Sequence, residues 1–143
     1  MDLGAVERVL VPVDLTDLSL EALETARSTV ADGARLHALF VLPELHPLDP
    51  AVSADLTPAV RIERATHTVA HRLGDQGFGD VALHVTIGEP AHEIVRLAED
   101  LHAELIVMSS HHYTGLMHAL VGSVAERVVR RASCAVLVLG PTG

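Results

Sequence analysis

Val9-Leu10-Val11-Pro12-Val13 is an uninterrupted run of apolar residues near the beginning of the sequence. A short apolar run of this kind is typical of a strand that is buried on both faces, as in a parallel sheet covered by helices. Two further runs, Leu105–Met108 and Cys134–Leu139, have the same character. Together the three runs predict an α/β fold built on a parallel sheet.

The segments between these runs carry apolar residues at helical spacing. Thr16 is the predicted N-cap of a first helix. The second and third helices are predicted to begin at Pro58 and Pro90, because proline favours the first helical position. Gly33 and Gly74 are expected to end the first two helices.

The remaining segments complete an alternating pattern. Leu36–Leu42 is the predicted second strand, and the alternation over Val81–Ile87 indicates a half-buried strand near a sheet edge. Ser123 and Glu126 match the S-x-x-E capping box, which predicts that a last helix begins there. Strands with helices between them predict a right-handed, doubly wound sheet.

Ligands of doubly wound sheets bind beyond the carboxyl ends of the strands, where the strand order reverses. This rule points to Pro12–Asp14, after the first predicted strand, and to Ser109–Ser123, after the fourth.

Length and composition predict one globular domain over residues 1–143. Apolar residues make up 49% of the chain, which is enough for a single core. The lone Cys134 excludes an internal disulfide and is expected to be a buried structural cysteine. Because the sequence also has no signal-like leader and no apolar run long enough for a membrane helix, a cytoplasmic protein is predicted.

The charge pattern excludes several classes of function. The net charge is −9, every cation is an arginine, and aromatic residues are only 2% of the chain, so nucleic-acid binding is not expected. A Walker P-loop is excluded because the chain contains no lysine, and no G-x-G-x-x-G fingerprint occurs.

Ser109–Gly115 is dense in hydroxyl residues and histidine, and the chain returns to a helix start at Gly122-Ser123. A helix N-terminus offers free N–H groups and a partial positive charge, so this connection can form an anion site without lysine. The alternative is that Gly122 and Ser123 only cap a helix.

Three segments resemble the universal stress protein family. Val9–Asp14 resembles its opening strand, and Ala132–Leu139 resembles its closing strand. Met108–Gly115, followed by Gly122–Val128, resembles its phosphate-binding segment. The resemblance implies a five-stranded parallel sheet of order 3-2-1-4-5, which is Rossmann-like and similar to the adenine nucleotide alpha hydrolase-like folds.

The nucleotide-binding branch of that family carries the pattern G-x2-G-x9-G-[ST]. The matching positions here are Ser109, His112, Gly122 and Ser123, so two of the three glycines are replaced. The imidazole of His112 either crowds the terminal phosphate or donates a hydrogen bond to it.

The resemblance implies ATP as the ligand, accompanied by Mg²⁺ or Mn²⁺. It implies that Asp14 contacts the adenosine portion and that Pro12, Val13 and Val41 line the adenine pocket. An Asp after a strand also commonly caps a helix or forms a turn, so two roles are open for Asp14. The residues implied around the phosphates are Ser109, His111, His112, Thr114, Gly115, Gly122, Ser123 and Val124.

The resemblance therefore implies an ATP-binding regulatory module of the stress response, with at most slow hydrolysis. The alternative is a stress protein of the non-nucleotide branch that acts through protein contacts, which the replacement by His112 favours. An α/β hydrolase or phosphatase is a third class, but the sequence lacks a nucleophile motif. Family dimers pair their last strands, which implies a homodimer through Val136 and Val138, besides an unidentified regulatory partner.

The chain contains ten histidines, which raises the alternative of a metal site. His111 and His112 are adjacent and lack a carboxylate or cysteine at ligand spacing, so no dedicated metal site is predicted. His67 and His71 are four residues apart and are expected to lie on a solvated helix face.

Overall fold

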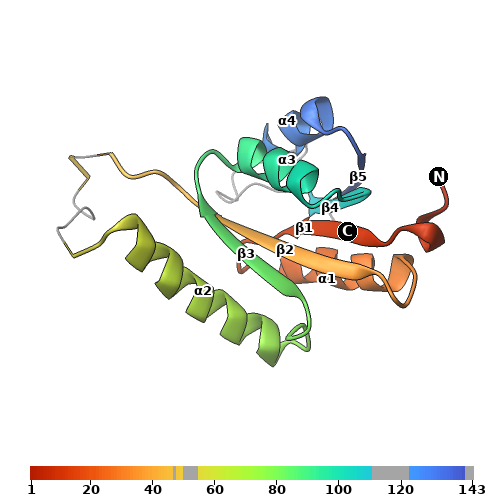
Figure 1. Cartoon of the computed structure of the whole chain (residues 1–143), viewed down its shortest axis with the longest axis horizontal. Coiled ribbons are helices and arrows are strands. Elements are labelled where there is room, and N and C mark those ends of the chain that lie inside the picture. The colour runs from red at the N-terminus through yellow and green to blue at the C-terminus, as the bar shows by residue number, and fades with distance from the viewer. Residues whose placement is uncertain (47, 50–54, 111–122, 141–143) are drawn as a thin grey trace.

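The computed structural model describes residues 1–46, 48–49, 55–110 and 123–140. Its centre is a five-stranded parallel sheet of order β3-β2-β1-β4-β5, which confirms the predicted fold class and strand order (Figure 1). The strands are β1 (Arg8–Pro12), β2 (Arg35–Leu42), β3 (Ala82–Ile87), β4 (Leu105–Ser109) and β5 (Ala135–Leu139).

Helices cover both faces of the sheet (Figure 1). The core on one face contains residues of α1 and α2, and the core on the other face contains residues of α3 and α4. The helical segments are η1 (Leu3–Ala5), α1 (Asp17–Thr29), α2 (Pro58–Asp75), α3 (Pro90–Asp100) and α4 (Ser123–Arg131). None of the described helices is long and apolar enough to span a bilayer.

The first strand is buried on both faces, as its apolar run predicted. Val9 and Val11 pack in the core on the α1 and α2 face, whereas Leu10 packs in the core on the α3 and α4 face. All three side chains are fully buried. This alternation follows from the two-residue period of a strand, and it makes β1 a strand on which both helix layers pack.

The strands at the two edges of the sheet differ from β1 in exposure. Every residue of β3 and of β5 is partly exposed. The alternating pattern over Val81–Ile87 therefore predicted an edge strand correctly. The apolar character of β5 does not by itself distinguish an edge strand from a central one.

The ends of the first two helices differ from the prediction. The first helix ends at Thr29, before Gly33, and α2 continues through Gly74 to Asp75. The left-handed residue that follows α2 is Gly77, two residues after Asp75, with a φ of 86°.

Two hydrogen bonds define this end of α2. The Phe78 N–H donates to the Leu73 carbonyl at 2.7 Å, and the Gly77 N–H donates to the Gly74 carbonyl at 3.2 Å. This is a Schellman motif, in which the residue after the left-handed glycine packs against the helix. Phe78 and Leu73 belong to the same buried core. Burial of Phe78 therefore decides which glycine ends the helix.

Two histidines form a pair on β2 and β3. His37 Nδ1 and His84 Nε2 are 3.0 Å apart, with ring centroids 5.2 Å apart. His37 is buried, and His84 is partly buried. One ring must supply an N–H and the other a lone pair, so this contact requires that at least one ring is neutral. Burial lowers the pKa of both rings, and nearby His84 and Arg35 lower the pKa of His37 further.

We predict that this pair makes stability depend on pH below neutrality. Because both folded pKa values lie below the usual value of 6.5, the unfolded chain binds protons more readily. The stabilisation is therefore fully present above about pH 6.5 and is lost as the pH falls through the lower folded values. Urea unfolding between pH 7.5 and 5 measures the slope of the free energy of unfolding against pH. His84→Gln should reduce this slope, and His67→Gln, on the exposed face of α2, should not. Equal slopes in all three proteins would contradict the prediction.

We also predict that Ile94→Ala destabilises the fold by about 2–5 kcal/mol, because Ile94 of α3 is fully buried and its loss leaves a cavity. Val129→Ala serves as the control, since Val129 of α4 is 53% exposed, and it should change the free energy of unfolding by less than about 0.5 kcal/mol. Urea unfolding at pH 7 compares the two variants. A similar loss of unfolding free energy in both would contradict the assignment of Ile94 to the core.

Candidate functional site

The predicted site lies where β1 and β4 diverge. These strands are paired in the centre of the sheet, with Leu10 opposite Ile106. The chain leaves β1 toward α1 on one face, and α4, which follows β4 in the chain, lies on the other face. The carboxyl ends of β1 and β4 therefore border the crossover point at which α/β sheets bind ligands.

Asp14 forms a turn directly after β1. Its Oδ1 accepts a hydrogen bond from the Thr16 N–H at 3.0 Å and another from the Thr16 hydroxyl. Leu15 has a φ of 70°, in the left-handed region, so the backbone bends sharply here. Thr16 is the N-cap residue of α1 as predicted, but its side chain makes no capping hydrogen bond.

Asp14 therefore stabilises the turn between β1 and α1. The Asp14 N–H donates to the Ser19 hydroxyl at 3.2 Å, and that hydroxyl donates to the Thr16 carbonyl at 3.0 Å. This network orients the half-buried carboxylate at the carboxyl edge of the sheet. Contact of Asp14 with adenosine stays a prediction.

Two of the residues predicted to line the adenine pocket, Val13 and Val41, have side chains on opposite faces of the sheet. Pro12 and Val13 are buried, and Val13 belongs to the core on the α1 and α2 face. Val41 is partly buried against the core on the opposite face. Adenine binding at this edge would therefore use backbone groups of β1 and β2 rather than a shared side-chain pocket.

The fourth strand continues one residue beyond the predicted run and ends at Ser109, opposite Leu139 of β5. The next residue, Ser110, is buried, and its N–H donates to the Leu139 carbonyl at 2.9 Å. The predicted phosphate contacts of His111, His112, Thr114, Gly115 and Gly122 lie outside the described residues, so they stay predictions.

The last helix begins at Ser123, as the sequence predicted. Its N-terminus lies at the carboxyl edge of the sheet, because α4 leads back to the amino end of the parallel strand β5. Ser123 is exposed, and Val124 is partly buried against the core. The carboxylate of Glu126, the other half of the predicted capping box, forms an ion pair with Arg130 at 2.8 Å.

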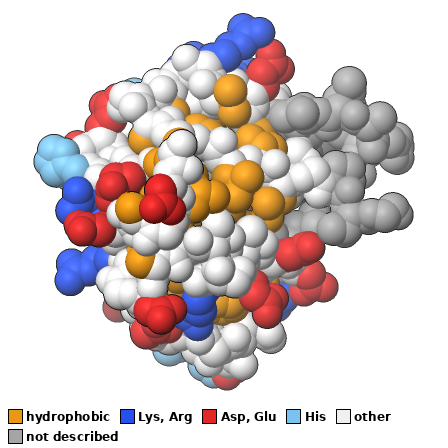
Figure 2. Space-filling view, turned by 90° about the vertical axis from the view of Figure 1, so that its right-hand side faces the viewer, with side chains coloured by type: hydrophobic (Ala, Val, Ile, Leu, Met, Phe, Trp, Pro, Cys, Tyr) orange, Lys and Arg blue, Asp and Glu red, His pale blue; other side chains and the backbone are white. Residues whose placement is uncertain are grey.

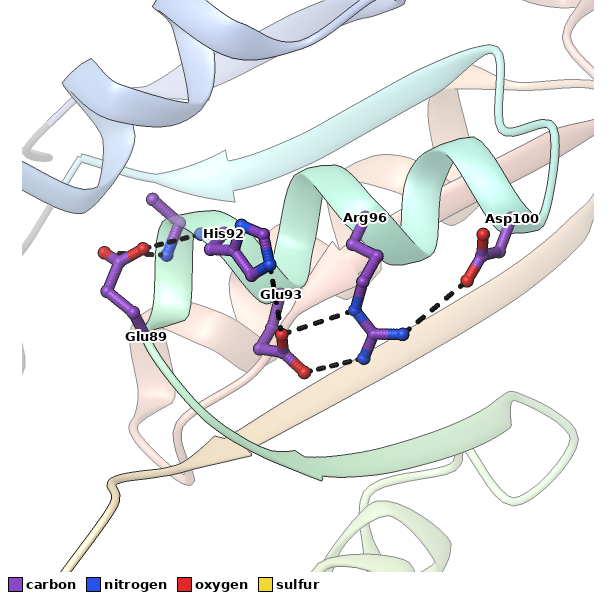
Figure 3. Close-up of polar contacts among 6 residues, drawn as sticks. Glu89, His92, Glu93, Arg96 and Asp100 are labelled. Carbon is purple, nitrogen blue, oxygen red and sulfur yellow. Dashed lines mark hydrogen bonds and ion pairs between the residues drawn. The ribbon is translucent and has the colours of Figure 1, made fainter.

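Glu89, which the sequence motifs did not indicate, lies at the start of α3 and contacts α4. Its carboxylate caps α3 by accepting hydrogen bonds from the Ala91 N–H at 3.3 Å and the His92 N–H at 2.7 Å (Figure 3). It also accepts a hydrogen bond from Arg127 of α4 at 3.0 Å. An acidic residue directly before Pro90 was the available signal, since anions favour helix N-termini.

These contacts determine the charge state of Glu89. Partial burial acts to raise its pKa, but the hydrogen bonds from His92, Arg127 and Ala91 together lower it. Glu89 is therefore ionised at neutral pH and is poorly suited to act as a general base.

A second carboxylate supports the same end of α3. Glu93 is 7% exposed and forms two hydrogen bonds with Arg96, which also pairs with Asp100 at 3.8 Å (Figure 3). The hydrogen bond from Arg96 lowers the pKa of Glu93. A Cβ at Gly88 would lie 2.9 Å from the Glu93 Cγ, so only glycine allows this close approach of strand and helix.

Two hollows lie at the opposite edge of the sheet. Their volumes are about 480 and 540 Å³, and both are lined by Ala31 and Gly33–Arg35 near the amino ends of β1 and β2. A hollow of about 390 Å³ lies at the carboxyl edge beside the end of β3, between Glu44 and Arg61. These three hollows lie away from the crossover point.

No group of three or more metal-ligating side chains occurs within residues 1–46, 48–49, 55–110 and 123–140. His67 and His71 lie on the exposed face of α2, as predicted. Cys134 is partly rather than fully buried, and burial raises the pKa of its thiol. A raised pKa disfavours the reactive thiolate, which agrees with a structural cysteine.

Hydrophobic side chains gather on the face at the right-hand side of Figure 1, toward which β5 lies, with charged side chains around them (Figure 2). Val136 and Val138 of β5 are partly exposed and pack against the core on the α3 and α4 face. An apolar edge strand is a natural place for pairing with another chain.

Comparisons with known proteins agree with this architecture. The model of the Universal stress protein family matches residues 5–140. Universal stress protein MJ0531 of Methanocaldococcus jannaschii is 32% identical over 139 residues, which cover 93% of this chain and 81% of that protein. Universal stress protein UspA from Lactobacillus plantarum is 26% identical, with a TM-score of 0.73 over 94% of this chain and 97% of that one.

A universal stress protein solved in complex with cAMP shares the fold, with a TM-score of 0.63 at 24% identity over 96% of this chain and 99% of that one. The family match extends from η1 to the end of β5 and thus includes all five strands. The chain belongs to the universal stress protein family.

Proposed function

We propose that this protein binds ATP at the carboxyl edge of its sheet and acts as a regulatory module of the stress response. The observation that carries the proposal is that α4, in the connection from β4 to β5, begins at the carboxyl edge of the sheet. Free amide hydrogens and the partial positive charge of a helix N-terminus suit phosphate oxygens. Since the chain has no lysine, these amides are the natural phosphate ligands.

The other end of the ligand would lie over the ends of β1 and β2. Asp14 is oriented there by its turn, and a carboxylate suits hydrogen bonding to ribose hydroxyls. The related fold solved with cAMP holds an adenine nucleotide in that protein. This supports the choice of an adenine nucleotide over other anions.

Mg²⁺ or Mn²⁺ would accompany the phosphates. The net charge of −9 repels a free triphosphate, and Asp14, Glu44 and Glu89 add negative charge near this edge. A divalent cation bound to the phosphates reduces that repulsion.

The second candidate is a stress protein that acts only through protein contacts. The sequence observation that favours it is His112, which replaces a glycine of the nucleotide motif. Under either candidate we propose that residues 1–143 form one domain, that the protein is cytoplasmic, and that it forms a homodimer and regulates an unidentified partner protein.

Isothermal titration tests nucleotide binding. We expect saturable binding of Mg²⁺–ATP, with Ser123→Ala weakening the affinity by about tenfold or more because a hydrogen bond to a charged group is lost. His112→Gly should change the affinity in either direction, according to whether the ring crowds or binds the phosphates. Absence of heat at millimolar ATP in both the wild type and His112→Gly would reject ATP as the ligand.

Phosphate release should be slow or absent, because no described side chain near the crossover point is placed to activate water.

Sedimentation equilibrium tests the dimer. We expect the double variant Val136→Thr/Val138→Thr to weaken dimerisation by about tenfold, because hydroxyl groups would be buried at the interface without partners. Val85→Thr, on the opposite edge strand, is the matched control and should leave the dimer unchanged. A monomeric wild type would contradict the proposal.

A further inference from the structure

One carboxylate connects the N-terminal halves of two helices. Glu89 accepts hydrogen bonds from the first turn of α3 and from the Arg127 guanidinium of α4. These donors come from helices on the same face of the sheet. Glu89 therefore ties α4 to the start of α3 at the carboxyl edge.

Arg127 is well placed to control the start of α4. It lies four residues after Ser123 and therefore on the same side of the helix, one turn further along. Helical side chains tilt toward the N-terminus, so its guanidinium extends over the first turn of α4. The first turn carries the amides proposed to bind phosphate.

The charge of Arg127 does not stabilise α4 through the helix dipole. Arg130 and Arg131 lie in the last turn, where cations complement the helix dipole. Arg127 lies in the middle of the helix and gains little from the dipole, so its favourable partner is Glu89 on another element. Glu89 and Arg127 are 41% and 55% exposed, and an ion pair this exposed adds little to global stability. The main effect of the Glu89–Arg127 pair is therefore on the orientation of α4.

We propose that Glu89 and Arg127 are positioning residues that hold the N-terminus of α4 in the orientation needed to receive phosphate. The inference rests on the proposed ATP site but concerns residues that do not touch the ligand. If Arg127 only positions α4, loss of the Glu89 charge weakens ATP binding. If Arg127 binds the phosphate directly, the same change strengthens ATP binding.

Isothermal titration of Mg²⁺–ATP and of adenosine into four variants tests the proposal. Glu89→Gln keeps an oxygen that can cap α3 but removes the charge that holds Arg127. We expect Glu89→Gln and Arg127→Gln each to weaken ATP by about three- to fivefold, with adenosine unchanged. Arg127→Lys should weaken ATP less than Arg127→Gln, because it keeps the charge. Arg130→Gln removes a similar exposed pair on the same helix and should leave ATP affinity unchanged.

Tighter ATP binding by Glu89→Gln would overturn the proposal, because it would show that freed Arg127 binds the phosphate directly. An equal loss of ATP affinity in Arg130→Gln would also overturn the proposal, because it would show that removing any ion pair on α4 weakens ATP binding.

Hydrogen exchange without nucleotide gives a readout that does not need ATP binding. Amides of residues 127–131 should exchange faster in Glu89→Gln and Arg127→Gln than in the wild type. If the wild type does not bind ATP but these amides exchange faster in the two variants, the proposed ATP site is rejected and the coupling of α4 to Glu89 is retained. Unchanged exchange in both variants would overturn the coupling itself.

Discussion

Burial of β1 between two helix layers is the constraint on which the rest of this structure depends. Val9 and Val11 pack under α1 and α2, and Leu10 packs under α3 and α4, so neither layer can be removed without exposing the strand. A parallel sheet requires crossover connections, and these place all carboxyl ends of the strands at one edge. The location of the candidate site follows from this packing rather than from any residue in the site.

The chemistry available at that edge reflects the composition of the chain. Without lysine, positive charge for an anionic ligand must come from arginine, protonated histidine, backbone amides or a bound cation. The guanidinium of Arg127 is already paired with Glu89, and that of Arg61 donates to the Pro43 carbonyl at 2.8 Å. Both guanidinium groups have protein partners, so backbone amides at the start of α4 are the groups best suited to phosphate.

Polar contacts on the α3 side hold the elements around this edge in register. Glu93 lies against Gly88, and Glu89 connects α3 to α4. At the far end of β3 and β2, His37 and His84 join the edge strand to its neighbour. The Glu89–Arg127 and His37–His84 contacts link segments that are distant in sequence, so both depend on the packing of the sheet and its helices.

The sequence by itself determined the fold class, the strand order through family resemblance, and the start of each of the four α-helices. These features depend on local patterns: apolar runs, helical spacing, and proline or threonine at helix starts, as at Pro58 and Pro90. It also located Ser123 at the beginning of α4 and the end of β4 to within one residue.

The tertiary structure decided what depends on distant partners. Helix α2 continues past Gly74 to Asp75, and the left-handed glycine that follows it is Gly77, because Phe78 is buried in the core. Val13 and Val41, predicted in one pocket, lie against opposite cores because the two strands present them to different faces. The pairing of Glu89 with Arg127, 38 residues apart, could not be read from local spacing. Sequence patterns report which face a residue prefers, whereas contacts between faces exist only after the sheet and helices have packed together.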